Sequence, residues 1–246
     1  MKPPPFAYHR PESLDAALRL LADDPDAKPL AGGQSLIPLL NFRLARPSAL
    51  VDLGGVAELA GIRVEDGALV VGTMTRQWDL EHAEQAHPLL REALRFVGHT
   101  ATRCRGTLGG SLVHADPTAE LPVCALALGA ELVAAGPRGR RTIPAEQFFV
   151  SVFTTALQPG ELLVEIRFPP VNGGWAFEEH AHRHGDFAVV CVAVAGDRVA
   201  LGGVGATPML YDGGDDLEPI GDLFAPAGYK KQLARRLVER ARERAG

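Results

Sequence analysis

The pattern of apolar residues predicts helices near both ends of the chain and in its middle. Residues 14–21 carry apolar side chains at helical spacing, and Ser13 precedes them as a candidate cap. A second helix is predicted over 88–97, beginning at Pro88 and closed by Gly98. A long closing helix is predicted over 229–245, with its inward face formed by Leu233, Leu237, Val238 and Ala241.

Short apolar runs predict strands over 49–53, 68–72 and 162–168. Residues 188–195 are almost wholly apolar, Gly196-Asp197 forms a two-residue turn, and 198–201 returns, which predicts a hairpin. Residues 213–216 are predicted to form a loop. We expect 99–122 to be irregular because it has glycines and no periodicity, and such long segments in compact domains are usually functional.

Two short segments each carry a glycine pair followed by a serine. They are Ala31-Gly32-Gly33-Gln34-Ser35 and Gly106-Thr107-Leu108-Gly109-Gly110-Ser111. Glycine permits positive φ and close approach, so backbone N–H groups of two such loops can converge on an anion such as a pyrophosphate. The alternative is that each pair is only a tight turn. Neither a Walker A loop nor a complete G-x-G-x-x-G fingerprint is present, which argues against a Rossmann nucleotide site.

Other candidate sites are weaker. His180, His182 and His184 alternate and would share one face of a strand, where a polar sheet surface is a simpler reading than a metal site. Arg103 and Arg105 flank the second glycine loop, and they either contact phosphate, position the loop or lie in solvent. We expect no metal held by this chain.

Composition narrows the function further. The 246 residues are 46% hydrophobic with a net charge of −5, which suggests one or two domains and gives no reason to expect a nucleic-acid partner. No apolar run is long enough for a membrane span, and the N-terminus lacks the features of a signal peptide. Three widely spaced cysteines fit a reducing compartment, so we expect a cytoplasmic protein.

The last segment, 229–246, is basic. Seven Lys or Arg residues stand against two Glu, while the rest of the chain carries a net charge of −10. The segment is either a solvated helix face or a surface that docks an acidic partner subunit.

Several motifs resemble one known family. Residues 30–38, 41–45 and 50–53 look like the first FAD motif of the medium subunit of carbon monoxide dehydrogenase and xanthine dehydrogenase, which are molybdenum hydroxylases. Residues 103–117 look like the second motif, and 153–157, 160–163 and 185–188 extend the match in the same order.

The resemblance implies an α+β fold. Residues 1–172 would form an FAD-binding domain of the p-cresol methylhydroxylase type, with two α/β subdomains at about 1–53 and 54–172. Residues 173–246 would form a smaller domain of antiparallel sheet and helix, shortened relative to the family after Thr207-Pro208.

By the same resemblance, FAD lies between the subdomains, with its pyrophosphate held by the glycine loops. Glu120 falls where relatives usually have Asp, Leu162 near the isoalloxazine, and Arg183 where relatives often carry Lys. The candidate cofactor-binding residues are Leu30, Ala31, Gly32, Gly33, Gln34, Ser35, Leu36, Thr107, Leu108, Gly109, Gly110, Ser111, Asp116, Glu120, Leu162 and Arg183. No catalytic residue is expected.

The function that the resemblance implies is electron transfer in a hetero-oligomer. A small subunit carrying [2Fe–2S] clusters and a large subunit carrying the molybdenum cofactor would be the partners. The chain would pass electrons to an acceptor such as NAD, a quinone or oxygen. Two alternatives are a stand-alone FAD-dependent oxidase or reductase of the same fold, and an assembly subunit that has lost its flavin.

Overall fold

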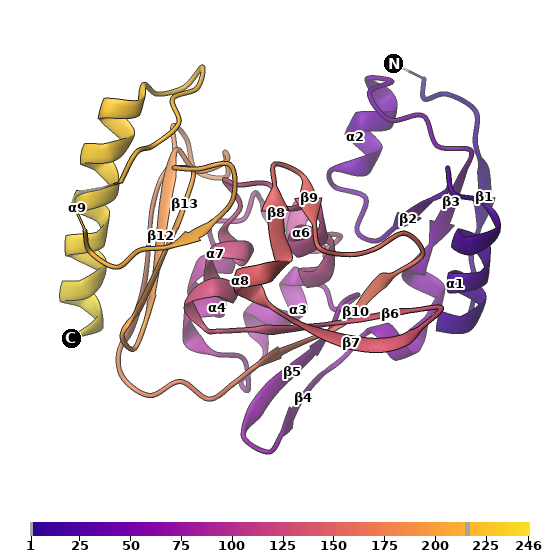
Figure 1. Ribbon diagram of the computed structural model, residues 1–246, viewed down its shortest axis with the longest axis horizontal. Coiled ribbons are helices and arrows are strands. Elements are labelled where there is room, and N and C mark those ends of the chain that lie inside the picture. Colours follow the sequence, from indigo (N-terminus) through magenta and orange to yellow (C-terminus); the bar gives the residue numbers. More distant parts are fainter. Residues whose placement is uncertain (1, 215–216) are drawn as a thin grey trace.

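The structure, a computed structural model, describes residues 2–214 and 217–246, and its elements form layers along the long axis of the molecule (Figure 1). The N-terminal layer holds a small parallel sheet of order β1-β3-β2. Ser13 caps its first helix as predicted, because its side chain accepts a hydrogen bond from the N–H of Ala16 at 3.2 Å. The elements are β1 (Ala7–His9), α1 (Leu14–Asp23), β2 (Lys28–Leu30), α2 (Leu36–Asn41) and β3 (Ala49–Asp52).

The middle layer holds an antiparallel sheet of order β4-β5-β10-β6-β7, whose central strand β10 is the last in sequence. Two short 3-10 helices, η1 and η2, lead into it. Its elements are η1 (Leu53–Gly55), η2 (Ala57–Leu59), β4 (Ile62–Glu65), β5 (Ala68–Gly72), α3 (Gln77–His82), α4 (Pro88–Leu94), α5 (Thr100–Arg103), α6 (Leu108–His114), α7 (Glu120–Ala127), β6 (Glu131–Gly136), β7 (Gly139–Pro144), α8 (Ala145–Phe148), β8 (Phe149–Ser151), β9 (Thr154–Thr155) and β10 (Leu162–Phe168).

The two faces of this sheet pack against different parts of the chain. Leu163 and Ile166 of β10 join the core formed with α3, α4, α6 and α7. Leu162 and Val164 join instead a core formed with the N-terminal layer, through Leu14 and Val51. Because both faces of β10 carry buried apolar side chains, the sheet fixes the N-terminal layer relative to the helices.

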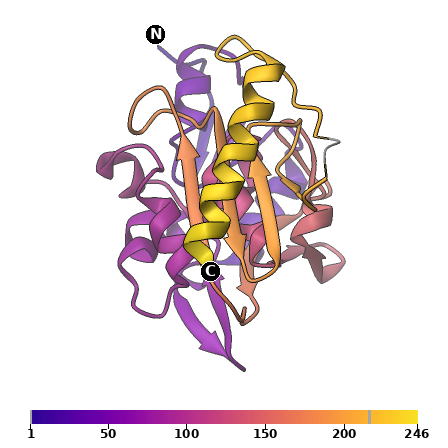
Figure 2. The ribbon, with the colours of Figure 1, turned by 90° about the vertical axis from the view of Figure 1, so that its left-hand side faces the viewer.

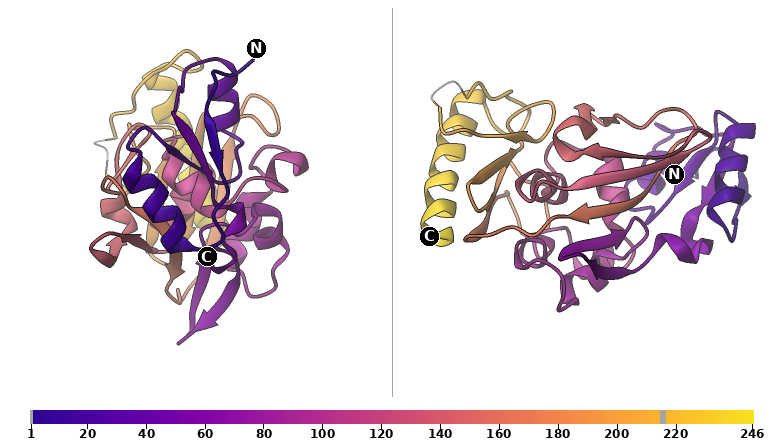
Figure 3. Two further views of the ribbon diagram at one scale, coloured as in Figure 1. Left: turned by 90° about the vertical axis from the view of Figure 1, so that its right-hand side faces the viewer. Right: turned by 60° about the horizontal axis from the view of Figure 1, so that its bottom comes forward.

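The C-terminal layer is an antiparallel sheet covered by one helix. The strands β11 (Trp175–His180), β12 (Val190–Ala195), β13 (Arg198–Gly202) and β14 (Met209–Leu210) lie in sequence order, and α9 (Ala227–Ala245) crosses the outer face (Figures 1 and 2). The inner face, with Phe177 and Cys191, packs on the helices of the middle layer. Seen from below and from the N-terminal side, α9 and α1 lie at opposite ends of the molecule (Figure 3).

The helices at 14–23, 88–94 and 227–245, the strands β3, β5 and β10, and the hairpin of β12 and β13 confirm the predicted elements. The prediction that 99–122 is irregular was wrong, because this segment contains α5, α6 and the start of α7. His182 and His184 also lie beyond the end of β11, so the three histidines do not share a strand face. Of the loop predicted over 213–216, Asp215 and Asp216 lie outside the described residues.

Much of the positive charge of α9 is paired within the chain. Lys230 is buried and donates to the carbonyl oxygen of Gly203 at 2.7 Å and to Asp222 at 2.6 Å. Arg240 and Arg244 both pair with Glu178 of β11, whose side chain is 7% exposed. Helix α9 is therefore held to its own sheet by charge as well as by apolar contact. Within the described ranges, no helix has the length and apolar composition needed to cross a membrane.

Candidate functional site

The two glycine loops, far apart in sequence, lie against each other. A Cβ on Gly32 would be 2.5 Å from the carbonyl oxygen of Arg105 and 2.7 Å from Cα of Gly106. A Cβ on Gly110 would be 3.4 Å from that of Ala31. The absence of side chains thus permits backbone-to-backbone contact between the N-terminal and middle layers, and neither loop is simply an isolated turn.

The first loop offers unused hydrogen-bond donors. Among the described residues, no acceptor is found for the backbone N–H groups of Gly32, Gly33, Gln34 and Ser35. Gly33 has a φ of 75°, which turns successive N–H groups toward one side as in an anion-binding nest. The hydroxyl of Ser35 makes no cap hydrogen bond either. This loop therefore presents a row of donors at the start of α2.

The second loop differs, because most of its backbone donors are already used. The N–H groups of Leu108 and Gly109 donate to the carbonyl oxygens of Thr75 and Thr73. Gly110 donates to the hydroxyl oxygen of Thr107 at 3.0 Å. The sequence predicted converging N–H groups from both loops, yet in the structure this loop offers close approach and the hydroxyl of Ser111 instead. The reason is that its glycines begin α6 and are anchored to the turn after β5.

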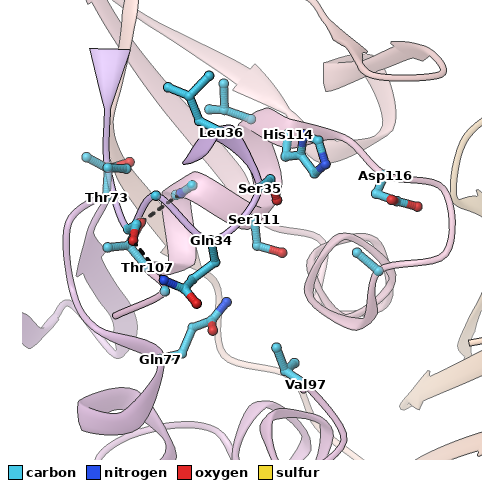
Figure 4. A pocket seen from close by; sticks show the side chains of 18 of the residues that line it. Gln34, Ser35, Leu36, Thr73, Gln77, Val97, Thr107, Ser111, His114 and Asp116 are labelled. Atoms are coloured by element: carbon cyan, nitrogen blue, oxygen red, sulfur yellow. Dashed lines mark hydrogen bonds between the residues drawn. The ribbon is translucent and has the colours of Figure 1, made fainter. Parts of the chain in front are cut away.

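A cavity of about 590 Å³ opens beside the two loops (Figure 4). That volume lies within the usual range for sites that bind small molecules and cofactors. All three layers contribute to the wall. β10 supplies Leu162 and Leu163, the loop after β11 supplies Gly185, Asp186 and Phe187, and the two glycine loops supply residues from the N-terminal and middle layers.

Most of the predicted site residues are brought together here. The cavity is lined by Ala31, Gly32, Gly33, Gln34, Ser35, Leu36, Thr107, Gly109, Gly110, Ser111, Asp116, Glu120 and Leu162. Three predicted residues are not part of the lining. Leu30 ends β2, Leu108 is fully buried in the core beneath α6, and Arg183 is exposed in the loop that carries Gly185.

More than half of the lining was not predicted from the sequence. Thr73, Gln77, Val97, His114 and Phe187 face the cavity from four different segments of the middle and C-terminal layers. His114 and Phe187 lie in motifs that had been recognised but were not among the candidate site residues, and nothing local marks the other three. They reach the cavity because β5, α3, α4 and α6 converge on it, which periodicity alone does not reveal.

Burial shifts the pKa of two titratable side chains in the cavity wall, Glu120 and His114. Desolvation raises the pKa of Glu120 to about 8, and the carboxyl of Glu179 on β11 adds to the shift. Glu120 is therefore a neutral acid at pH 7. Burial also lowers the pKa of His114, whose ring stacks on Phe153 with centroids 4.9 Å apart. Hence the wall carries less charge than its sequence suggests.

Arg103 holds together the segments that precede the second glycine loop. Its side chain is buried, pairs with Glu81 at 2.7 Å and donates to the carbonyl oxygens of Val97 at 3.2 Å and Gly98 at 3.4 Å. It thus ties the end of α4 to α5, just before the second glycine loop. Arg105 is exposed, and its carbonyl oxygen accepts from Arg76. Of the alternatives for Arg103, positioning of the loop fits the geometry.

The residues fit a dinucleotide such as FAD. Free N–H groups and hydroxyls beside glycines suit a pyrophosphate, and the apolar wall formed by β10 and by Val97, which follows α4, suits flat ring systems. The side-chain oxygen Oε1 of Gln77 is buried in this wall without a hydrogen-bond partner, as expected where a bound group supplies one. In residues 2–214 and 217–246, no group of His, Cys, Asp or Glu side chains is placed to hold a metal ion.

Comparison with known proteins identifies the family. Residues 4–171 match the family described as the FAD binding domain in molybdopterin dehydrogenase. The chain is 49% identical over 195 residues to 6-hydroxypseudooxynicotine dehydrogenase complex subunit alpha of Paenarthrobacter nicotinovorans, covering 77% of this chain and 66% of that relative, just under two thirds. It is 37% identical over 278 residues to the carbon monoxide dehydrogenase medium chain of Hydrogenophaga pseudoflava, covering 98% of this chain and 97% of the relative.

The fold agrees with this assignment. A solved structure of quinoline 2-oxidoreductase from Pseudomonas putida 86 contains a chain that superposes with a TM-score of 0.95 at 36% identity. The match covers 100% of this chain and 98% of that one. The resemblance read from the glycine motifs is thus confirmed, as is the α+β fold. This chain belongs to the FAD-binding medium-subunit family of the molybdenum hydroxylases, a family of oxidoreductases, and FAD is its cofactor.

Proposed function

We propose that FAD occupies the cavity between the two glycine loops. Its pyrophosphate is placed against Gly32, Gly33, Gln34 and Ser35, because their N–H groups are the unused donors of the site. This is the single observation that carries the placement. Ser111 and Thr107 add hydroxyls from the facing loop. The remaining proposed residues are Ala31, Leu36, Gly109, Gly110, Asp116, Glu120 and Leu162 in the wall, together with Leu30, Leu108 and Arg183, which lie outside the lining.

We also propose that the FAD-binding domain covers residues 1–172, with subdomains at about 1–53 and 54–172, and that 173–246 forms the second domain. The separate parallel and antiparallel sheets of the first two ranges support this division. The junction between β10 and β11 has few residues and two prolines, Pro169 and Pro170, which suits a boundary.

The proposed role is an electron relay within a hetero-oligomer. Electrons arrive from [2Fe–2S] clusters of a small subunit, after oxidation of a substrate at the molybdenum site of a large subunit. They leave for an acceptor such as NAD, a quinone or oxygen. The names of the relatives, a subunit of a dehydrogenase complex and a medium chain, support membership of such an assembly.

FAD supplies the redox chemistry when bound, because it takes electrons singly and releases them in pairs. The residues of this chain bind it, orient it and exclude water. Cys124 and Cys191 are fully buried and burial raises the pKa of both thiols, so neither serves as a nucleophile. A relay requires no such group.

Reoxidation kinetics test the relay. The FAD-loaded chain is reduced with one equivalent of dithionite under argon and mixed with NAD, ubiquinone-1 or oxygen, and the return of absorbance near 450 nm is followed. The relay predicts fast reoxidation by one acceptor, and no turnover of reduced substrates in the absence of partner subunits. Steady turnover by the isolated chain would favour the stand-alone oxidase. A folded chain that takes up no FAD would favour the flavin-free assembly subunit.

A further inference from the structure

Gln77 stands at the first position of α3, next to the second glycine loop. Its backbone N–H donates to the carbonyl oxygen of Gly106 at 2.9 Å, and the neighbouring Arg76 pairs with Thr107 in an isolated bridge. These contacts fix the backbone of Gln77 relative to the loop. The position of its side chain is therefore set by the same elements that build the cavity.

The side chain is enclosed and incompletely paired. Gln77 is 4% exposed, it lines the cavity, and its Oε1 has no hydrogen-bond partner in the part of the chain that is described. Figure 4 shows the carboxamide pointing from α3 into the pocket. Oε1 lies against Gly106, where a Cβ would clash with this oxygen and lie 2.9 Å from Cδ, so glycine at this position leaves room for the carboxamide.

A buried acceptor without a donor destabilises a protein, so the arrangement favours a bound group that supplies one. Phosphate cannot, because at neutral pH its oxygens in a pyrophosphate only accept. A carboxamide offers a donor beside an acceptor, and it pairs best with a ring edge that offers the converse. Adenine has an amino group beside a ring nitrogen, and isoalloxazine has an N–H between two carbonyls. Val97, in the same wall, supplies apolar surface.

We propose that the carboxamide of Gln77 recognises the edge of one ring system of FAD through paired hydrogen bonds. The inference rests on the proposed placement of FAD in this cavity. It assigns Gln77 a part in selecting the cofactor, because a ligand that lacks the matching edge leaves Oε1 unpaired.

The test compares wild type, Gln77→Met and Gln232→Leu. Methionine keeps the length and much of the volume of Gln77 but removes the carboxamide. Gln232 lies exposed on α9, away from the cavity, so its variant controls for loss of a glutamine as such. Each protein is stripped of flavin and titrated with FAD, FMN and ADP, and its thermal unfolding is recorded without ligand.

We expect Gln77→Met to bind FAD about tenfold more weakly while its ligand-free melting temperature is unchanged or higher, because an unpaired buried acceptor has been removed. If the affinity for ADP falls as well, the contact is with adenine. If the affinity for FMN falls as well, the contact is with isoalloxazine. Unchanged FAD affinity overturns the inference. A fall in affinity for FAD alone, with the affinities for ADP and FMN unchanged, also overturns it, because that result points to a contact with sugar hydroxyls. If this variant does not fold, Gln77→Leu carries the same readout. Failure of wild type and Gln232→Leu to bind FAD would instead count against the proposed function.

Discussion

Replacement of Gly32 by alanine tests whether contact between the two glycine loops shapes the FAD site. The φ of Gly32 is not in the left-handed region, so alanine is compatible with its backbone. The added methyl group, however, would lie 2.5 Å from the carbonyl oxygen of Arg105 and 2.7 Å from Cα of Gly106. Backbone atoms cannot rotate away as a flexible side chain can, so the loops themselves must separate.

The size of the effect follows from these contacts. Restoring ordinary contact distances requires the loops to move apart by about 1 Å, and overpacking of this kind costs about 1–3 kcal/mol of folding free energy. The same movement draws the hydroxyls of Ser111 and Thr107 away from a pyrophosphate held by the first loop. Loss of one or two charge-assisted hydrogen bonds weakens FAD binding about 10- to 100-fold.

Gly228→Ala is the matched control, because a Cβ at Gly228, in the first turn of α9, meets no atom within 4 Å. It should leave FAD affinity unchanged and keep or slightly raise stability. FAD affinity is measured by quenching of flavin fluorescence, and stability by urea unfolding of the FAD-free protein. If Gly32→Ala binds FAD as tightly as wild type, the two loops do not jointly form the site.

Two further predictions concern charge. Glu120 has a raised pKa when folded, so its contribution to stability is fully present below the ordinary value of 4.5 and is lost as pH rises toward 8. Gln at this position cannot ionise, and Glu120→Gln should therefore gain about 3 kcal/mol over wild type at pH 7 but little at pH 5, measured by urea unfolding of the FAD-free proteins. Parallel profiles of the two proteins would refute this. Glu178→Gln removes the charge that holds Arg240 and Arg244, and it should cost about 1–2 kcal/mol because both arginines are partly exposed. As a control, Glu239→Gln at an exposed position should cost no more than about 0.5 kcal/mol of folding free energy. An equal loss of stability in both variants would show that the pairing of Glu178 with the two arginines does not stabilise the fold.

The elements predicted correctly are those whose signals are local. Ser13 and the apolar spacing after it define α1, and Gly196-Asp197 between two apolar runs defines the hairpin of β12 and β13. The closing helix was equally clear from its apolar stripe. In each case propensity, pattern and turn chemistry agree, so tertiary contacts have nothing to override.

The misreading of 99–122 has a physical cause. Gly109 and Gly110 resemble loop residues, yet they lie inside α6, where glycine is intrinsically unfavourable. Close packing against the turn after β5 requires glycine at this point of α6, since a Cβ on Gly109 would overlap Thr73. Packing thus overrides propensity at the same residues that form the site. More than half of the cavity wall was not predicted for a related reason, because residues such as Gln77 and Val97 become neighbours only when separate segments of the chain converge.

The ion pairs of α9 could not be predicted from the sequence. The sequence left open whether its positive charge lies in solvent or docks an acidic partner. Lys230, Arg240 and Arg244 are already paired with Asp222, Glu178 and Glu92, so a substantial part of the charge stabilises this chain itself. Sequence spacing does not reveal these pairs, because they join α9 to β11 and α4 across the fold.

The most direct test of the central claim is a titration of the purified, flavin-free chain with FAD, followed by absorbance and by fluorescence quenching. The account predicts saturation at one FAD per chain, and a large loss of affinity in Gly109→Ala, whose new methyl group would overlap Thr73 and displace the second loop. A folded chain that binds no FAD, or one that binds it equally well with alanine at position 109, would contradict the placement of the cofactor between the two loops.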